Sequence, residues 1–134
     1  MNGIAIVVAL LTASESVAAV VPKTAIFPIK APQGVTAPYI VLNIAGDADE
    51  QMLNGTANYP ETRIEAACYA TTGTAALLIA DAVQQTLGNV VKQIVGAARD
   101  VDIYFANFKV TEEAEDGVLA RVILHFYVRW RNAA

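Results

Sequence analysis

A chain of 134 residues is long enough to bury one hydrophobic core, and we expect a single domain over residues 1–134. Its formal net charge of −4 argues against general nucleic-acid binding, which requires a basic face. The single cysteine excludes an internal disulfide and fits a reducing compartment. Because 55% of the residues are hydrophobic and the mean hydropathy is +0.43, we expect a partner subunit to cover part of the apolar surface.

The first apolar stretch, Ile4 to Leu11, is too short to span a membrane, because a spanning helix needs about 18 apolar residues. A signal peptide is an alternative, with a small-residue cleavage site at Ser16-Val17-Ala18. The segment Met1-Asn2-Gly3 carries no basic side chain, however, and Glu15 lies just before that site. The helical spacing of apolar residues therefore favours a helix of the folded domain over residues 4–20.

Three strands are predicted in the first half of the chain. Thr24 to Ile29 contains Pro28, which confines this short strand to an edge or a bend. Tyr39 to Ala45 is almost continuously apolar, so we expect both of its faces to be covered. Glu61 to Tyr69 alternates, with Thr62, Ile64, Ala66 and Cys68 on one face and Arg63, Glu65, Ala67 and Tyr69 on the other.

A second helix is predicted from Thr74 to Leu87, after the capping residues Thr71 to Thr74. Its apolar stripe consists of Ala76, Ile79, Ala80, Val83 and Leu87. The segment Val90 to Ala98 fits either a strand or a helical turn. The pattern leaves the two open.

The end of the chain, Val101 to Arg131, predicts a long β-hairpin with an acidic tip that contains Asp116-Gly117. Apolar residues occupy every second position from Val118 to Trp130, and a more polar set lies between them. At about 3.3 Å per residue the last strand is roughly 40 Å long, which favours a bend or a reach beyond its own domain. The element order predicts an α+β fold: an antiparallel β-sheet with a long C-terminal hairpin, flanked by two α-helices on one face.

Catalytic chemistry is not predicted. His125 is the only histidine, which excludes a histidine-based metal cluster. Cys68 lies in an apolar run and fits a small buried side chain better than a nucleophile. The acidic segment Asp47 to Glu50 lacks the ligand spacing of a calcium loop. We therefore expect no enzyme, no cofactor and no metal site.

Several short segments resemble the tail-completion, or tail-terminator, proteins of long-tailed bacteriophages and phage-like particles. They are Ile26-Phe27-Pro28, Ala31-Pro32-Gln33-Gly34, the run from Ala37 to Leu42, the strand from Arg63 to Ala70, and Ala80-Asp81-Ala82-Val83. The first helix and the C-terminal hairpin are similar to that family's pattern in order and length, so the resemblance covers most of the chain.

The resemblance implies a small α+β virion protein that forms a ring, usually a hexamer, at the head-proximal end of the finished tail. Such a ring stops polymerisation of the tail tube protein and meets a head connector or stopper protein. The family has no enzymatic activity and no cofactor. Assembly is expected in the cytoplasm of the bacterial host, without a membrane. The negative net charge suits a lumen through which DNA passes without specific binding.

The residues expected at the subunit or partner interface are charged. Arg121, His125, Arg129 and Arg131 of the last strand are predicted to face a neighbour's acidic loop, either Glu112, Glu113, Glu115 and Asp116 or Asp47, Asp49 and Glu50. Ordinary surface charge is the competing interpretation. Three other functions stay open: a head-side connector or stopper protein, a secreted protein, and a small ligand-binding or regulatory domain with a pocket between the second helix and the sheet.

Overall fold

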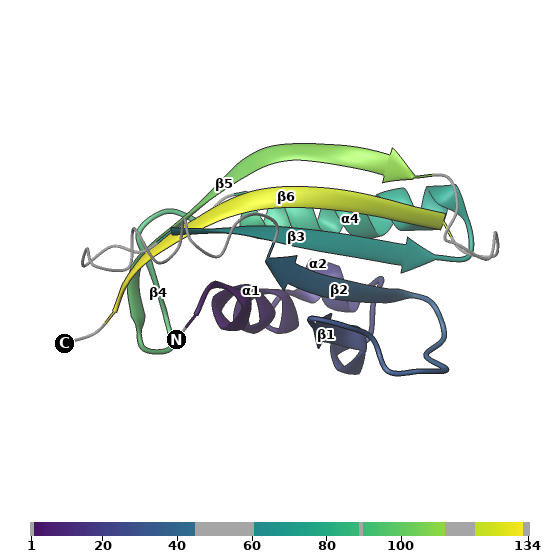
Figure 1. Cartoon of the computed structure of the whole chain (residues 1–134), viewed down its shortest axis with the longest axis horizontal. Helices are drawn as coiled ribbons and strands as arrows, with labels where there is room; N and C mark the ends of the chain where they lie inside the picture. Colours follow the sequence, from purple (N-terminus) through teal and green to yellow (C-terminus); the bar gives the residue numbers. More distant parts are fainter. Residues whose placement is uncertain (1, 45–60, 89, 112–119, 133–134) are drawn as a thin grey trace.

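The computed structural model describes residues 2–44, 61–88, 90–111 and 120–132, and in them a six-stranded sheet carries its helices on one face (Figure 1). In space the strands follow the order β1-β2-β3-β6-β5-β4. Their bounds are β1 Ile26–Pro28, β2 Tyr39–Ile44, β3 Glu61–Ala70, β4 Gln93–Val95, β5 Ala98–Thr111 and β6 Ala120–Asn132. The predicted α+β class and the long C-terminal hairpin are confirmed.

The sheet is mixed, whereas the sequence predicted an antiparallel one. β1 runs parallel to β2, and each remaining pair of neighbours is antiparallel. The parallel pair arises because the turn-rich segment 29–38 returns the chain to the end of the sheet where β1 started. Pro28 lies in the edge strand β1, as predicted, where its missing N–H costs no ladder bond.

The predicted helix over residues 4–20 is divided into α1 (Gly3–Thr12) and α2 (Glu15–Ala18). Ser14 causes the break, because its side chain accepts a hydrogen bond from the backbone N–H of Val17 and so caps α2. The Ser14 hydroxyl also lies 2.8 Å from the hydroxyl of Thr86. This bond ties the junction of the two helices to the third helix, α4 (Gly73–Leu87).

α4 follows the predicted pattern closely. Thr72 is its N-cap, and its Oγ1 accepts a hydrogen bond of 3.1 Å from the backbone N–H of Ala75. The predicted apolar stripe is buried against the sheet: Ala76, Ile79, Ala80, Val83 and Leu87. The second helix therefore covers the sheet as the sequence indicated.

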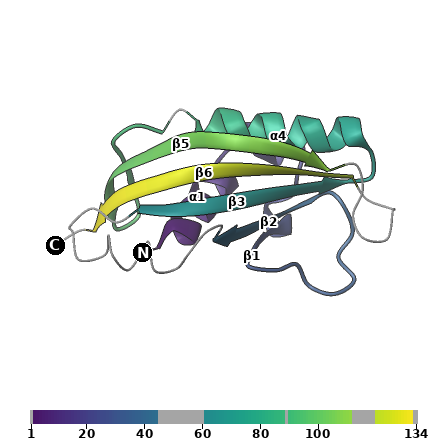
Figure 2. The same cartoon turned by 45° about the horizontal axis from the view of Figure 1, so that its top comes forward.

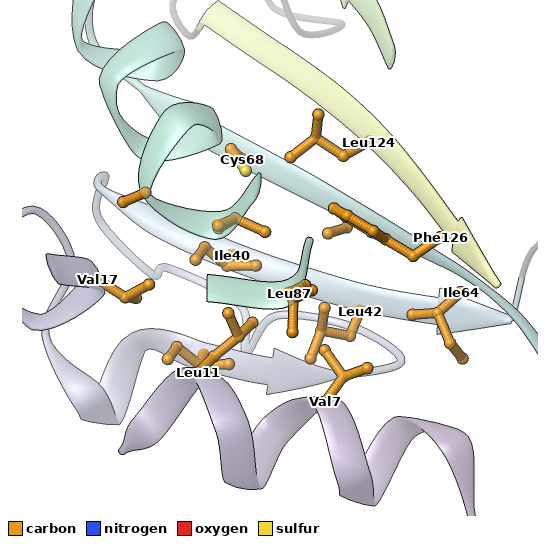
Figure 3. Close-up of a cluster of buried hydrophobic side chains, with 14 of the residues drawn as sticks. Val7, Leu11, Val17, Ile40, Leu42, Ile64, Cys68, Leu87, Leu124 and Phe126 are labelled. Atoms are coloured by element: carbon orange, nitrogen blue, oxygen red, sulfur yellow. The ribbon is translucent and has the colours of Figure 1, made fainter. Parts of the chain in front are cut away.

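The core lies between the helices and one face of the sheet (Figure 3). Every second residue of β3 and β6 points into it, including Ile64 and Cys68 of β3 and Leu124 and Phe126 of β6. Burial raises the pKa of the Cys68 thiol to about 12. The prediction that Cys68 acts as a small buried hydrophobic side chain is confirmed.

Two predictions about other strands change. In β2, Ile40 and Leu42 are buried but Val41 and Asn43 are only partly covered, so the expectation of two covered faces is wrong. Residues 90–98, for which the sequence allowed a strand or a helical turn, contain the short strand β4, which pairs with β5 at the edge of the sheet.

The hairpin of β5 and β6 is bent, as its length indicated (Figure 2). The pairing register shifts at two places in β5, between Arg99 and Asp102 and between Phe105 and Asn107. Extra residues of this kind bend a strand and increase its twist. The predicted acidic tip, residues 112–117, lies outside the described residues.

Candidate assembly surface

The face of the sheet opposite the helices is the candidate functional surface, and we call it the open face. Described helices lie on the other side of the sheet in both views (Figures 1 and 2). The alternate residues of β3 and β6 that point to the open face are mostly half-buried. The half-buried ones are Glu61, Arg63, Glu65 and Tyr69 of β3 and Arg121, Ile123, His125, Tyr127 and Arg129 of β6. The predicted polar face of the last strand is thus confirmed.

Antiparallel pairing of β3 with β6 sets a row of cross-strand pairs on the open face. Glu61 lies opposite Arg129, and the Arg129 Nε is 3.4 Å from the Glu61 Oε2. Both side chains are more than one-third exposed, so water weakens this ion pair. Arg129, which was predicted to face a neighbour, therefore has a carboxylate partner in its own chain.

His125 lies opposite Glu65, with the His125 Nε2 3.8 Å from the Glu65 Oε1. Burial lowers the pKa of His125, the positive charge of Arg63 lowers it further, and Glu65 opposes the shift. The Nδ1 atom is buried and has no hydrogen-bond partner among the described residues. A second proton would make Nδ1 an unsatisfied buried donor, so the ring geometry agrees with the lowered pKa.

Two arginines on the open face lie over tyrosine rings, and neither forms an ion pair with a carboxylate of a described residue. The Arg121 Cζ lies 5.9 Å from the ring centroid of Tyr69, and the Arg63 Cζ lies 6.0 Å from that of Tyr127. In the register of β3 and β6 each arginine sits opposite the tyrosine that it covers. The Nε atoms of Arg63 and Arg121 are buried without a hydrogen-bond partner in the described part of the chain.

The Arg121–Tyr69 pair continues an aromatic row across the sheet. Tyr39 of β2 stacks on Tyr69 with ring centroids 4.6 Å apart, and Phe27 of β1 lies 6.2 Å from Tyr39. Cross-strand aromatic pairs of this kind stabilise a sheet and hold their side chains in fixed positions. The guanidinium of Arg121 is thereby positioned before any partner binds.

The other predicted interface residues divide into two groups. Arg131 is exposed, and its Nε lies 3.7 Å from the Asp100 Oδ2. The acidic residues proposed to meet these cations all lie outside the described residues: Asp47, Asp49, Glu50, Glu112, Glu113, Glu115 and Asp116. Their pairing with a neighbour stays a prediction.

Sequence reasoning did not include the β3 residues that share the surface. Arg63, Glu65 and Tyr69 were assigned to one face of their strand, but their partners on β6 were not identified. Opposite charges at matching steps of two alternating strands, Glu61 and Glu65 against Arg129 and His125, were the available signal.

An apolar cavity of about 160 Å³ lies between the start of α4 and the loop before β2. Its lining is apolar except for one threonine: Val20, Ala37, Pro38, Ala70, Thr71, Ala75, Leu78 and Ile79. A small-molecule site normally needs several converging polar groups for orientation, and a single hydroxyl offers little of this. The cavity therefore fits an apolar side chain better than a polar ligand.

Among the described residues, no group of three metal-binding side chains comes together. No helix in the same part of the chain is long and apolar enough to cross a membrane.

Comparison with known proteins identifies a structural relative and a family for this chain. A chain in the virion of a native gene transfer agent particle is similar in structure, with a TM-score of 0.74 and 22% identity, over 97% of this chain and 95% of that one. Residues 5–131 match the model of the family described as Tail completion protein gp17. None of the curated proteins compared with the chain matches it.

The fold and the family match define a structural protein of a bacteriophage tail. The chain belongs to the tail completion protein gp17 family, since the match covers nearly its whole length. The predicted resemblance is confirmed.

Proposed function

We propose that this protein forms a ring at the head-proximal end of a phage tail, most simply a hexamer, where it ends polymerisation of the tail tube protein and joins the tail to a head connector. The family match over residues 5–131 is the observation that carries the proposal. The similar chain from a gene transfer agent particle supports the same setting, a protein that works inside a virion. Assembly would take place in the cytoplasm of the bacterial host.

The open face supports a role in assembly. It holds cations at fixed positions, and the partly covered side chains of β3 and β6 leave little entropy to lose on binding. Arg63 and Arg121 are the best-placed cations for a partner, because no carboxylate of a described residue lies within ion-pair distance of either guanidinium. A neighbour's acidic loop would supply the missing charges, as proposed for residues 112–116 or 47–50.

The exposed apolar residues support the same proposal. Eight large hydrophobic side chains are exposed in the described part of the chain, namely Ile29, Ile44, Leu77, Leu78, Val91, Ile94, Tyr104 and Phe105. Scattered exposure is normal, but Leu77 and Leu78 are neighbours on α4, and Val91 and Ile94 lie three residues apart around β4. A ring interface would cover them.

The net charge of −4 is compatible with a channel for DNA. A negative wall repels phosphates, so DNA would slide through the ring without being held.

Electron microscopy of the protein mixed with its own tail tube subunit tests the proposal. We expect tubes of uniform length that carry a ring at one end. An Arg121→Glu variant should cap fewer tubes, and Lys23→Glu, which reverses an exposed charge away from the open face, is the matched control. Tubes that continue to grow and carry no ring at either end would remove the terminator role and favour a connector or stopper function on the head side.

A further inference from the structure

Residues 91–94 form an exposed tip at one end of the molecule, in which the apolar residues Val91 and Ile94 flank the exposed Lys92 and Gln93. The side chains of Ile94 and Val91 are 75% and 67% exposed, more than any other large hydrophobic side chain that the structure describes. They belong to the segment around β4, the outermost strand of the sheet beside β5.

The backbone of this tip is held in place. Val90 and Val95 on either side are buried in the core. The backbone N–H of Ile103 donates to the Val90 carbonyl at 3.1 Å, and the N–H of Lys92 donates to the Asp102 Oδ1 at 2.9 Å. Lys92 itself has a φ of 48°, a left-handed conformation that side-chain-bearing residues seldom adopt without a compensating gain.

The apolar cavity described above, which could accept such a tip, lies at the opposite end of the molecule. The cavity of about 160 Å³ lies beside the first two turns of α4, and Leu78 at its rim is more than half exposed. Figure 1 shows β4 at one end of the long axis and the turn from β3 into α4 at the other, and Figure 2 agrees. An apolar cavity of about 150 Å³ in a protein accepts a benzene molecule, so one isoleucine side chain fits such a volume.

We propose that the Val91/Ile94 tip of one copy docks at the cavity beside Leu78 of a second copy of this chain, with the Ile94 side chain inserted into the cavity. A second copy is the fitting occupant because the Ile94 side chain and the cavity are both apolar and lie at opposite ends of one molecule. Neither end can satisfy the other within its own chain. Contacts between different surfaces of identical chains are heterologous, and they close into a ring when the rotation between neighbours permits it. The proposal rests on the proposed ring, for which it names the contact.

Cysteine cross-linking tests the contact in the mixture of the protein with its tail tube subunit. In the Ile94→Cys, Leu78→Cys double variant, a short bismaleimide should join neighbours into a ladder of multiples of the chain. Cys68 will not interfere, because it is buried and burial raises the pKa of its thiol. The control pair is Ile94→Cys with Gln84→Cys, because Gln84 is exposed on the same helix but does not line the cavity.

The possible results distinguish failure of the proposed contact between copies from failure of the proposed terminator function. A ladder in the Leu78 pair alone supports the contact, even where the tubes stay uncapped and the terminator role fails. Rings or capped tubes without a ladder overturn the contact and retain the function. A ladder that links the chain to the tube subunit instead of to itself also overturns it. As a second measurement, Ile94→Asp should weaken self-association about tenfold or more, whereas Ile94→Leu should leave it nearly unchanged.

Discussion

Arg129 on β6 and Glu61 on β3 form a cross-strand ion pair, with the arginine Nε 3.4 Å from the carboxylate Oε2. The cation that was expected to bind a neighbour thus already has a partner within the chain. Reversing its charge therefore acts first on the fold of the same molecule, and any effect on assembly must be measured separately.

We predict that Arg129→Glu lowers the free energy of unfolding by up to about 1 kcal/mol, because two carboxylates would then lie directly opposite each other in the sheet. Adding Glu61→Arg should restore most of the loss. Urea unfolding of the wild type, both single variants and the double variant measures the coupling. Equal stabilities in all four would show that the pair contributes nothing.

The same variant tests the predicted contact between subunits. If Arg129 also meets a neighbour's acidic tip, Glu113→Arg should restore assembly to Arg129→Glu. Rescue by Glu61→Arg alone would place the interaction inside one chain. If neither single reversal alters ring formation or tube capping, the proposed intersubunit charge pairing is wrong.

Thr62→Val should stabilise the protein by about 1 kcal/mol. The Thr62 Oγ1 is buried beneath α1 and has no hydrogen-bond partner among the described residues, and removing an unsatisfied hydroxyl in favour of a methyl of similar shape is favourable. Thr62→Ser, which retains the hydroxyl and loses the methyl, is the control and should destabilise. A lower urea midpoint for the valine variant would indicate that the hydroxyl is satisfied in solution.

The stability should depend on pH through His125. Because its pKa is lowered below the ordinary value of 6.5 in the folded chain, the unfolded chain binds more protons just below that pH. The contribution is fully present above pH 6.5 and is lost as the pH falls from there through the lower, folded pKa. Urea unfolding of the wild type and of His125→Gln should be measured from about pH 7.5 to about pH 4.5, the range in which histidine titrates. The difference in unfolding free energy between the two proteins should change only between pH 6.5 and the lower, folded pKa of His125.

A direct titration distinguishes the causes of the His125 shift. Nuclear magnetic resonance should report a pKa below 6.5 in the wild type. Arg63→Gln should raise the pKa, because it removes a nearby positive charge, and Glu65→Gln should lower it further. An unchanged value in both variants would leave burial as the sole cause.

Thr72→Ala should cost about 1 kcal/mol, because it removes the hydrogen bond from the N–H of Ala75 at the start of α4. The neighbouring change Thr71→Ala is the matched control: Thr71 is exposed and does not cap the helix. Thermal unfolding followed by circular dichroism measures both variants. Equal losses in the two would contradict the assigned cap.

Alternation of side chains along the strands was sufficient to predict the two faces of β3 and β6. Period-two patterns report burial directly, because successive side chains point to opposite faces of a sheet. The same logic failed for β2, where an apolar sequence suggested two covered faces but Val41 lies on the open one. Apolar composition does not indicate whether a second layer exists.

The other features that the sequence did not predict depend on contacts between segments that are distant in the chain. The break at Ser14 depends on a cap and on a hydrogen bond to Thr86, 72 residues away. The stacking of Arg121 on Tyr69 depends on the register between β3 and β6, which no local pattern specifies. The charged residues of the last strand were therefore found, but their partners in the same chain were not.

Because β6 has one covered and one open face, even-numbered and odd-numbered positions of this strand should respond differently to substitution. Even-numbered positions from Val122 to Trp130 are buried, and the odd-numbered ones from Arg121 to Arg129 are only partly covered. In a library of single substitutions, a screen for soluble folded protein should reject changes mainly at even positions. A selection for infectious particles should reject changes at odd positions as well, and the difference between the two profiles would map the residues used only in the virion.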